Sequence, residues 1–241
     1  MRSGAAPGAP LKPSSGLSGR KKATSGSSSA ARVAEILARL DKKYPGVRCA
    51  LHHKNAWQLL IATILSAQCT DVRVNIVTPE LFKRFPTPAA MAQASIEELE
   101  ALVRTTGFFR NKAKHIQAAS QMLVHSFASK VPEDIDQLMT LPGVARKTAN
   151  VVLGSWYGIA VGVVVDTHVS RITQRLELTR ATDAPKIEQD LMKIIPSNRW
   201  IDFSHQIIHF GREICIARKP RCADCPLETL CYSKDKTWSS H

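Results

Sequence analysis

Apolar side chains recur every three or four residues through most of the chain, the spacing that places them on one face of an α-helix. After Ala31 the first such face consists of Val33, Ile36, Leu37 and Leu40. Pro45 and Gly46 should end this helix, because proline cannot continue it and glycine accepts the backbone angles of a stop. A denser apolar segment at residues 57–65 predicts a more buried helix, which Asn55 could cap.

Further helices are expected along the rest of the chain. They cover residues 71–86, 95–107, 111–127, 133–140, 167–176, 185–195 and 204–215. Ser95 and Glu98 have the spacing of a capping box. Only the apolar run Val161 to Val165 resembles a strand, and the sequence contains no alternating hairpin pattern, βαβ rhythm or internal repeat. The pattern predicts an all-α fold.

The first 30 residues differ in composition from the rest. Gly, Ala, Ser and Pro dominate this segment and large apolar side chains are almost absent. Such a segment cannot bury enough apolar surface to fold, so we expect a disordered basic tail. Its lack of acidic residues would also suit an organelle transit peptide, but no amphipathic helical stripe is visible. A tail that touches DNA nonspecifically is the favoured interpretation.

The chain is strongly basic, with a formal net charge of +13. The first 30 residues contribute five of the 33 Lys and Arg residues and no acidic residue, so residues 31–241 still carry +8 from 28 basic and 20 acidic residues. This balance favours a polyanionic partner, although charge alone does not separate nucleic acid from an anionic membrane.

The 241 residues, 44% of them hydrophobic, can form one large or two small domains with a packed core. The longest apolar runs, Leu59 to Leu65 and Ile159 to Val165, are far shorter than the roughly 20 residues of a membrane span. We therefore expect no membrane partner. We also expect a monomer that works in the cytoplasm of a bacterial cell, with organelle targeting by the N-terminal tail as the alternative.

A Pro-Gly turn separates two helical segments at residues 142–143, and Lys147 follows one turn into the second segment. Backbone N–H groups at such a helix start can bind a phosphate oxygen, because Gly143 has no side chain to keep the phosphate away. This is how a helix-hairpin-helix holds a DNA backbone, and it would place an amine nucleophile beside the DNA. The alternative is an ordinary turn followed by a solvated lysine.

The candidate metal ligands Cys215, Cys222, Cys225 and Cys231 form a C-x6-C-x2-C-x5-C pattern. Two disulfides are one alternative, but the chain has no apolar signal segment, which favours a reduced compartment. Structural zinc sites usually pair two short Cys-x2-4-Cys hooks, whereas this pattern has one. A [4Fe-4S] cluster held by four thiolates is the favoured interpretation and zinc the alternative.

The loop between the first two of these cysteines is basic. Arg218, Lys219 and Arg221 lie there, and Pro220 stiffens them. A cluster that orders this loop would give a scaffold for phosphate contacts. The alternative is a solvated loop that is merely basic.

Asp166 follows the apolar run 161–165 and lies 19 residues beyond Lys147. An acid in this position can cap the helix that begins at Thr167, which is the better interpretation for an isolated aspartate. It can also present a carboxylate to a cleft, and one side chain can do both.

These features together resemble the endonuclease III family, the iron–sulfur helix-hairpin-helix DNA glycosylases, over about Ala31 to Tyr232. The hairpin with its lysine, the downstream Val-Asp-Thr-His, the cysteine quartet and the Leu-Ser-Ala-Gln at residues 65–68 occur in the family's order. Two departures are visible. Ala145 stands where family hairpins often carry a second glycine, and the interval from Lys147 to Asp166 is one residue longer than in the commonest form. We expect the loop Gly158 to Gly162 to absorb that residue.

The resemblance implies two helical lobes with a DNA-binding cleft between them. A helical barrel with the hairpin would span residues 50–158, and a discontinuous cluster lobe would combine residues 31–49 with residues 159–241. Lys147 and Asp166 would face each other across the cleft. The implied activity is base-excision repair, in which Lys147 attacks the deoxyribose, releases an oxidised pyrimidine and forms a Schiff base that permits β-elimination. Asp166 would take a proton and stabilise positive charge on the sugar.

Double-stranded DNA that contains oxidised pyrimidines or abasic sites is the implied substrate. By resemblance, Gln68 would fill the gap left by the extruded nucleotide and Phe108 would be a second wedge, with a helix-terminal Gln and a core Phe as the alternatives. Further DNA contacts are expected from the hairpin and from the basic loop. They are Leu141, Gly143, Ala145 and Arg146 in the hairpin, and Arg218, Lys219 and Arg221 in the loop.

Three other functions compete with this hypothesis. A monofunctional relative, such as the adenine-specific mismatch glycosylase, would not carry the lysine, so Lys147 argues against it. A noncatalytic DNA-binding or redox module would use the hairpin and the cluster and leave Asp166 idle. A zinc-stabilised interaction domain would contain zinc in place of iron and sulfide.

Overall fold

The computed structural model describes residues 25–238. The basic tail predicted at residues 1–30 falls mostly outside this part, together with its two interpretations as a DNA-touching tail or a targeting signal. The first helix, α1 (Ser25–Lys43), begins before Ala31, where the helix was expected to begin. Ala30 and Ala31 have high helix propensity, which favours extension of the helix beyond its amphipathic part.

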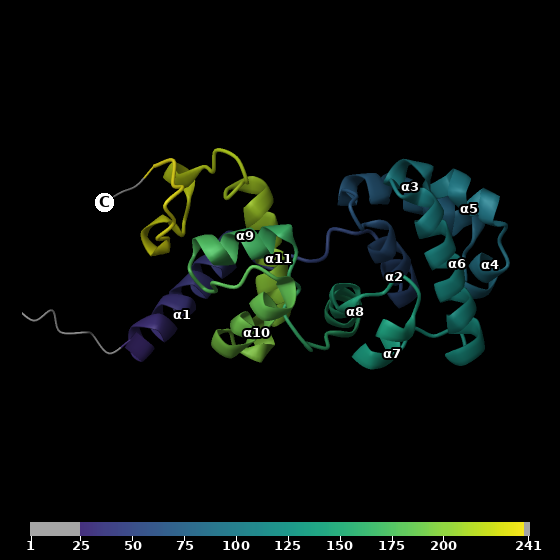
Figure 1. The fold of residues 1–241 in the computed structure, drawn as a ribbon, viewed down its shortest axis with the longest axis horizontal. Helices are drawn as coiled ribbons and strands as arrows, with labels where there is room; N and C mark the ends of the chain where they lie inside the picture. Colours follow the sequence, from purple (N-terminus) through teal and green to yellow (C-terminus); the bar gives the residue numbers. More distant parts are fainter. Residues whose placement is uncertain (1–24, 239–241) are drawn as a thin grey trace, which may run out of the picture.

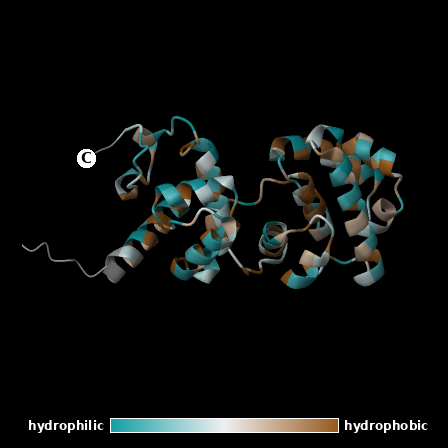
Figure 2. Ribbon diagram, in the orientation of Figure 1, coloured by the Kyte–Doolittle hydropathy of each residue, from teal (hydrophilic) through white to brown (hydrophobic). Residues whose placement is uncertain are grey.

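The first of two hydrophobic clusters lies among the helices from residue 56 to residue 152, which we call the hairpin lobe. These helices are α2 (Ala56–Leu65), α3 (Asp71–Arg84), α4 (Pro88–Ala92), α5 (Ile96–Val103), α6 (Phe109–Ser126), α7 (Ile135–Thr140) and α8 (Arg146–Val152). Every residue of α2 except Gln58 is buried, so α2 is the central helix of this lobe. Its hydrophobic residues stand out in brown in Figure 2.

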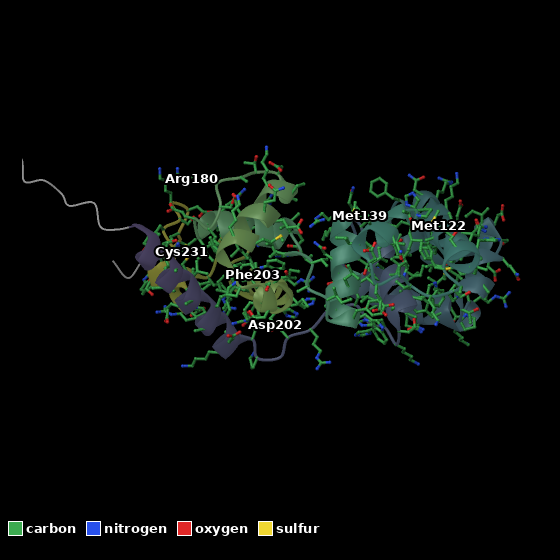
Figure 3. All side chains as sticks on the ribbon, turned by 90° about the horizontal axis from the view of Figure 1, so that it is seen from below. Met122, Met139, Arg180, Asp202, Phe203 and Cys231 are labelled. Atoms are coloured by element: carbon green, nitrogen blue, oxygen red, sulfur yellow. The ribbon has the colours of Figure 1, made fainter. Side chains whose placement is uncertain are left out.

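The second hydrophobic cluster joins the two ends of the described chain. It lies among α1, α9 (Thr167–Arg175), α10 (Ala184–Ile194) and α11 (Trp200–Glu213). We call these helices, with the C-terminal loop at residues 214–238, the cysteine lobe. The two lobes lie side by side in Figure 1, and Figure 3 places Phe203 and Cys231 in the cysteine lobe and Met122 and Met139 in the hairpin lobe.

Two arginines of α1 bind the C-terminal loop. Arg32 donates hydrogen bonds to the carbonyl oxygens of Leu176 and Leu230. About two turns further along, Arg39 donates to the carbonyl oxygen of Pro226 at 2.9 Å and to Thr229 Oγ1 at 2.8 Å. The N-terminal helix is therefore fastened to the segment that carries the last two cysteines.

Two segments of chain cross between the lobes, before α2 and after α8 (Figure 1). The second crossing contains Val161 to Val165, and the strand predicted there is wrong: residues 25–238 contain no strand. This apolar run is buried, but it has no partner strand. The N–H of Val164 instead donates to Ser204 Oγ of α11 at 3.0 Å. The prediction of an all-α fold is confirmed within the described residues.

Local helix signals also agree with the structure where they were strong. Asn55 Oδ1 accepts from the N–H of Gln58 at 2.8 Å, and Ser95 Oγ accepts from the N–H of Glu98 at 3.2 Å, as N-caps do. A short π-helix (Leu153–Tyr157) follows α8 directly.

Candidate active site and cysteine centre

The predicted hairpin is present between α7 and α8. The N–H of Val144 donates to the carbonyl oxygen of Leu141 at 3.1 Å, which closes the turn. Gly143 has a φ of +79°, and a Cβ built on it would lie 2.9 Å from the Cβ of His115 on α6. Only glycine satisfies both the backbone angle and this close approach.

Lys147 lies in the first turn of α8, and its side chain is exposed. Lys147 lines two cavities. The smaller, of about 90 Å³, lies between the lobes, and the larger, of about 500 Å³, extends along the start of α9 toward Thr182. Asp166 lines the same two cavities from the other lobe. The fold therefore places the two predicted catalytic residues on the walls of the same two cavities.

Asp166 is the N-cap of α9. Its Oδ1 accepts hydrogen bonds from the N–H groups of His168 and Val169, both at 2.8 Å. No hydrogen bond to its Oδ2 is found among the described residues. The capping interpretation is confirmed, and it leaves one carboxylate oxygen for chemistry because both capping bonds use the other.

Arg146 binds the other lobe. Its Nε donates to Glu188 Oε2 at 2.9 Å and its second guanidinium nitrogen donates to Glu188 Oε1 at 3.1 Å. Glu188 belongs to α10 and is buried. The expected phosphate contact competes with this bidentate ion pair. Leu141 is also buried, so only its backbone can reach DNA, whereas Ala145 is exposed at the start of α8.

Several polar groups that have no local signal in the sequence lie at or beside the smaller cavity. Arg212 of α11 forms an ion pair with Asp71 of α3 at 2.6 Å, across the two lobes. Ser155 Oγ and His205 Nε2 lie 3.1 Å apart, which makes a second polar link between the lobes. Burial lowers the pKa of His205, so this ring favours its neutral form.

Gln68 and Phe108 share an unusual backbone conformation. Both have positive φ, +53° at Gln68 and +48° at Phe108, where residues other than glycine are strained. Both side chains are exposed, and 65% of the surface of Phe108 is accessible. The alternative of a core Phe is therefore wrong. Strained backbone conformations of this kind are concentrated at functional sites.

A buried lysine supports the turn that carries Phe108. The Nζ of Lys112 donates to the carbonyl oxygen of Thr106 at 2.7 Å, and its N–H donates to the carbonyl oxygen of Phe108 at 3.1 Å. Burial lowers the pKa of Lys112. A lysine in this sequence context gives no signal that it is buried, which is why it was missed.

The four C-terminal cysteines line one cavity in the cysteine lobe. All six cysteines of the chain are free thiols. Arg175 donates to Cys215 Sγ at 3.3 Å, and the N–H of Thr237 donates to Cys222 Sγ at 3.5 Å. Burial raises the pKa of the Cys225 thiol to about 12. Four thiols around one cavity, with N–H donors aimed at two of the sulfurs, fit the donor set of an iron–sulfur cluster.

No group of three or more His, Cys, Asp or Glu residues among residues 25–238 has the arrangement that holds a single metal ion.

The basic loop between the first two cysteines is held by its backbone. Arg175 donates to the carbonyl oxygens of Ile216 at 3.0 Å and Ala217 at 3.2 Å. Arg218 and Lys219 are exposed and form no ion pair within the described part of the chain, whereas Arg221 pairs with Asp224 at 3.1 Å. Two of the three predicted phosphate contacts therefore present free cations.

Among the described residues, no helix combines the length and apolarity needed to cross a membrane.

Comparison with known proteins places these features in context. A family model described as HhH-GPD superfamily base excision DNA repair protein matches residues 61–197. The endonuclease III of Synechocystis sp. is 56% identical over 202 residues, which cover 84% of this chain and 92% of the relative. The endonuclease III of Bacillus subtilis is 42% identical and covers 83% of this chain and 91% of the relative.

Solved structures show the same similarity. A trapped endonuclease III–DNA covalent intermediate matches with a TM-score of 0.80 and 44% identity, over 84% of this chain and 95% of that one. A thermostable thymine-DNA glycosylase, at 19% identity and a TM-score of 0.73, covers 85% of this chain and 95% of that one, and shares the fold.

Proposed function

Because the chain belongs to the endonuclease III family of the HhH-GPD superfamily, we propose that it is a bifunctional DNA glycosylase and abasic-site lyase whose reaction is carried by Lys147 and Asp166. The observation that carries this proposal is the position of the two residues on the same two cavities, one from each lobe. The substrate is double-stranded DNA that contains an oxidised pyrimidine or an abasic site.

The first step exposes the damaged base. A base in the stack is out of reach, so the nucleotide must rotate out of the duplex at a cost of about a few kcal/mol, which a lesion with weakened stacking reduces. Gln68 and Phe108 project from the surface of the hairpin lobe and fill the gap in the duplex. The Asp71–Arg212 pair and His205 line the smaller cavity, where they would supply polar contacts to the extruded base.

Lys147 then acts as the nucleophile. Its neutral Nζ attacks C1′ of the sugar, the glycosidic bond breaks, and the base leaves with a proton. Opening of the sugar ring gives an imine between Nζ and C1′. Loss of a proton from C2′ expels the 3′ phosphate and cuts the strand. The unbonded Oδ2 of Asp166 would accept the proton from Lys147 and face the positive charge that develops on the sugar.

We propose that Cys215, Cys222, Cys225 and Cys231 hold a [4Fe-4S] cluster. When bound, the cluster supplies a rigid crosslink and the metal charge that keeps buried thiols deprotonated. Arg175, which donates both to Cys215 and to the loop backbone, would then hold the loop that carries Arg218 and Lys219 in one conformation. A zinc-stabilised domain is the alternative, and iron, sulfide and zinc assays on purified protein separate the two.

The experiment that tests the activity is borohydride trapping on a duplex with one thymine glycol, beside an undamaged duplex and an abasic-site duplex. We expect a covalent adduct with both damaged duplexes and none with the undamaged one. A protein that binds these duplexes with its cluster intact but forms no adduct would be a monofunctional or purely DNA-binding protein.

A further inference from the structure

We infer that Glu188 is a positioning residue that sets Lys147 relative to Asp166, and that Arg146 serves this link in preference to a DNA phosphate. The inference rests on the proposed function, because it concerns the geometry of the proposed nucleophile. Glu188 lies on α10 of the cysteine lobe and only 7% of its surface is accessible. A carboxylate buried to this degree is stable only when it is paired.

Among residues 25–238, every hydrogen bond to the Glu188 carboxylate comes from one helix of the other lobe. Arg146 donates two, at 2.9 and 3.1 Å, and Asn150 Nδ2 donates one to Oε1 at 3.0 Å. Arg146 and Asn150 lie four residues apart on α8, so they share a face. Lys147 is the next residue after Arg146, so this clamp holds the turn from which Lys147 projects.

The same carboxylate also lies against the segment that leads to Asp166. A Cβ built on Gly162 would lie 1.9 Å from Glu188 Oε1 and 3.0 Å from Asn150 Nδ2. Glycine at this position lets the crossing chain approach the ion pair, four residues before Asp166. One carboxylate therefore touches the helix that carries Lys147 and the backbone that delivers Asp166.

The geometry separates this role from a simple stabilising ion pair. An ion pair that stabilises one lobe would not alter the distance between two residues on different lobes. Glu188 links the lobes at the hairpin, and a misplacement of the reacting groups by about 1 Å can slow a reaction about 100-fold. The predicted signature is a loss of chemical rate at constant DNA affinity.

The test compares wild type with Glu188→Gln, Gly162→Ala and the double variant, using the full-length holoenzyme. Single-turnover borohydride trapping is measured on a duplex with a preformed abasic site, together with the Kd for the same duplex and the Tm. Starting from an abasic site leaves base removal out of the measured rate. Glu98→Gln is the matched control, because Glu98 pairs with Arg84 at 2.5 Å within the hairpin lobe.

We expect Glu188→Gln and Gly162→Ala each to slow trapping about 10- to 100-fold with Kd within about twofold of wild type. The double variant should be no slower than the slower single variant, since both disturb one contact. Glu98→Gln should trap at the wild-type rate. Trapping by Glu188→Gln at the wild-type rate, or a loss equal to that of Glu98→Gln, would overturn the positioning role.

Arg146→Lys gives a second measurement that does not remove the buried acid. Lysine keeps the positive charge but lacks the two-pronged geometry that Glu188 uses. Slower trapping at unchanged Kd supports the link, whereas a raised Kd at an unchanged rate shows that Arg146 binds phosphate. If wild type itself forms no adduct, the proposed function fails. If wild type traps and the variants trap equally fast, the positioning role alone fails.

Discussion

Lys147 and Asp166 line the same two cavities although they belong to different lobes. Lys147 extends from the first turn of α8, and Asp166 begins α9 after the chain has crossed between the lobes. The proposed active site is therefore a property of the lobe arrangement. Changes at these two residues should separate chemistry from stability.

Lys147→Ala should abolish the borohydride-trapped adduct while lesion-DNA affinity stays within a few fold of wild type. The side chain is exposed and has no hydrogen-bond partner among the described residues, so the Tm should remain within about 1 °C. Trapping and Kd on a thymine glycol duplex provide the measurements. An adduct that survives in this variant would mean that another amine is the nucleophile.

Asp166→Asn should slow base removal about 100- to 10,000-fold, the range for loss of a general acid–base group. Asparagine caps helices as well as aspartate, so the Tm should change little. Asp166→Ala should lose the cap as well and cost about 1 kcal/mol of unfolding free energy. Single-turnover base release and chemical denaturation measure the two effects. Equal rates for wild type and the Asn variant would remove Asp166 from the mechanism.

Phe108→Gly and Phe108→Ala should both raise the Kd for a lesion duplex by about tenfold, because neither can occupy the gap in the stack. Their stabilities should differ. Glycine relieves the strain of a φ of +48°, so the Gly variant should be more stable than the Ala variant by about 1 kcal/mol. Equal lesion affinity in all three proteins would mean that Phe108 is an exposed residue without a role in lesion binding.

Gly211→Ala should destabilise the protein although alanine is the better helix former. A Cβ at this position of α11 would lie 2.6 Å from His168 Nδ1 and 2.8 Å from Ile172 Cδ1, both on α9. The two helices would have to move apart, at a cost of about 1–3 kcal/mol. At Gly154 the nearest atom is a flexible Ile201 side chain at 3.2 Å, so Gly154→Ala should cost less. Urea denaturation of both variants measures which one loses more unfolding free energy.

Alanine at both Arg218 and Lys219 should weaken binding to damaged and undamaged duplexes equally. Each lost phosphate contact should reduce the slope of log K against log salt concentration by about 0.9. Arg221 pairs with Asp224, so Arg221→Ala should change the slope less. A double variant with an unchanged salt slope would show that this loop does not touch DNA.

The hydrophobic pattern predicted the longer helices because each has one buried face set by local spacing. It failed at Val161 to Val165, where an apolar run looks the same whether it pairs in a sheet or crosses between two lobes. It also missed the five-residue helix α4, which is too short to show a period.

The candidate site likewise contains residues that the sequence predicted and residues that it did not. Lys147, Asp166 and the cysteines belong to local motifs and were visible in the sequence. Glu188 and Arg212 were not, because each acts on a residue far away in the chain, 42 positions from Arg146 in one case and 141 positions from Asp71 in the other. Nothing near either residue indicates its partner.

The hydrogen bonds from Arg32 and Arg39 to the C-terminal loop join residues that a ribosome synthesises 198 and 187 positions apart. A ribosome releases α1 first, and its apolar face must wait while the entire hairpin lobe is synthesised and can fold. The apolar face of α1 can pack once α9 to α11 have emerged, whereas the bonds of its two arginines are complete only when residues 226–230 follow. Closure of the cysteine lobe is therefore a late event of synthesis, and a chain truncated before Pro226 would keep the apolar cover of α1 but lose the bonds from Arg32 to Leu230 and from Arg39 to Pro226 and Thr229.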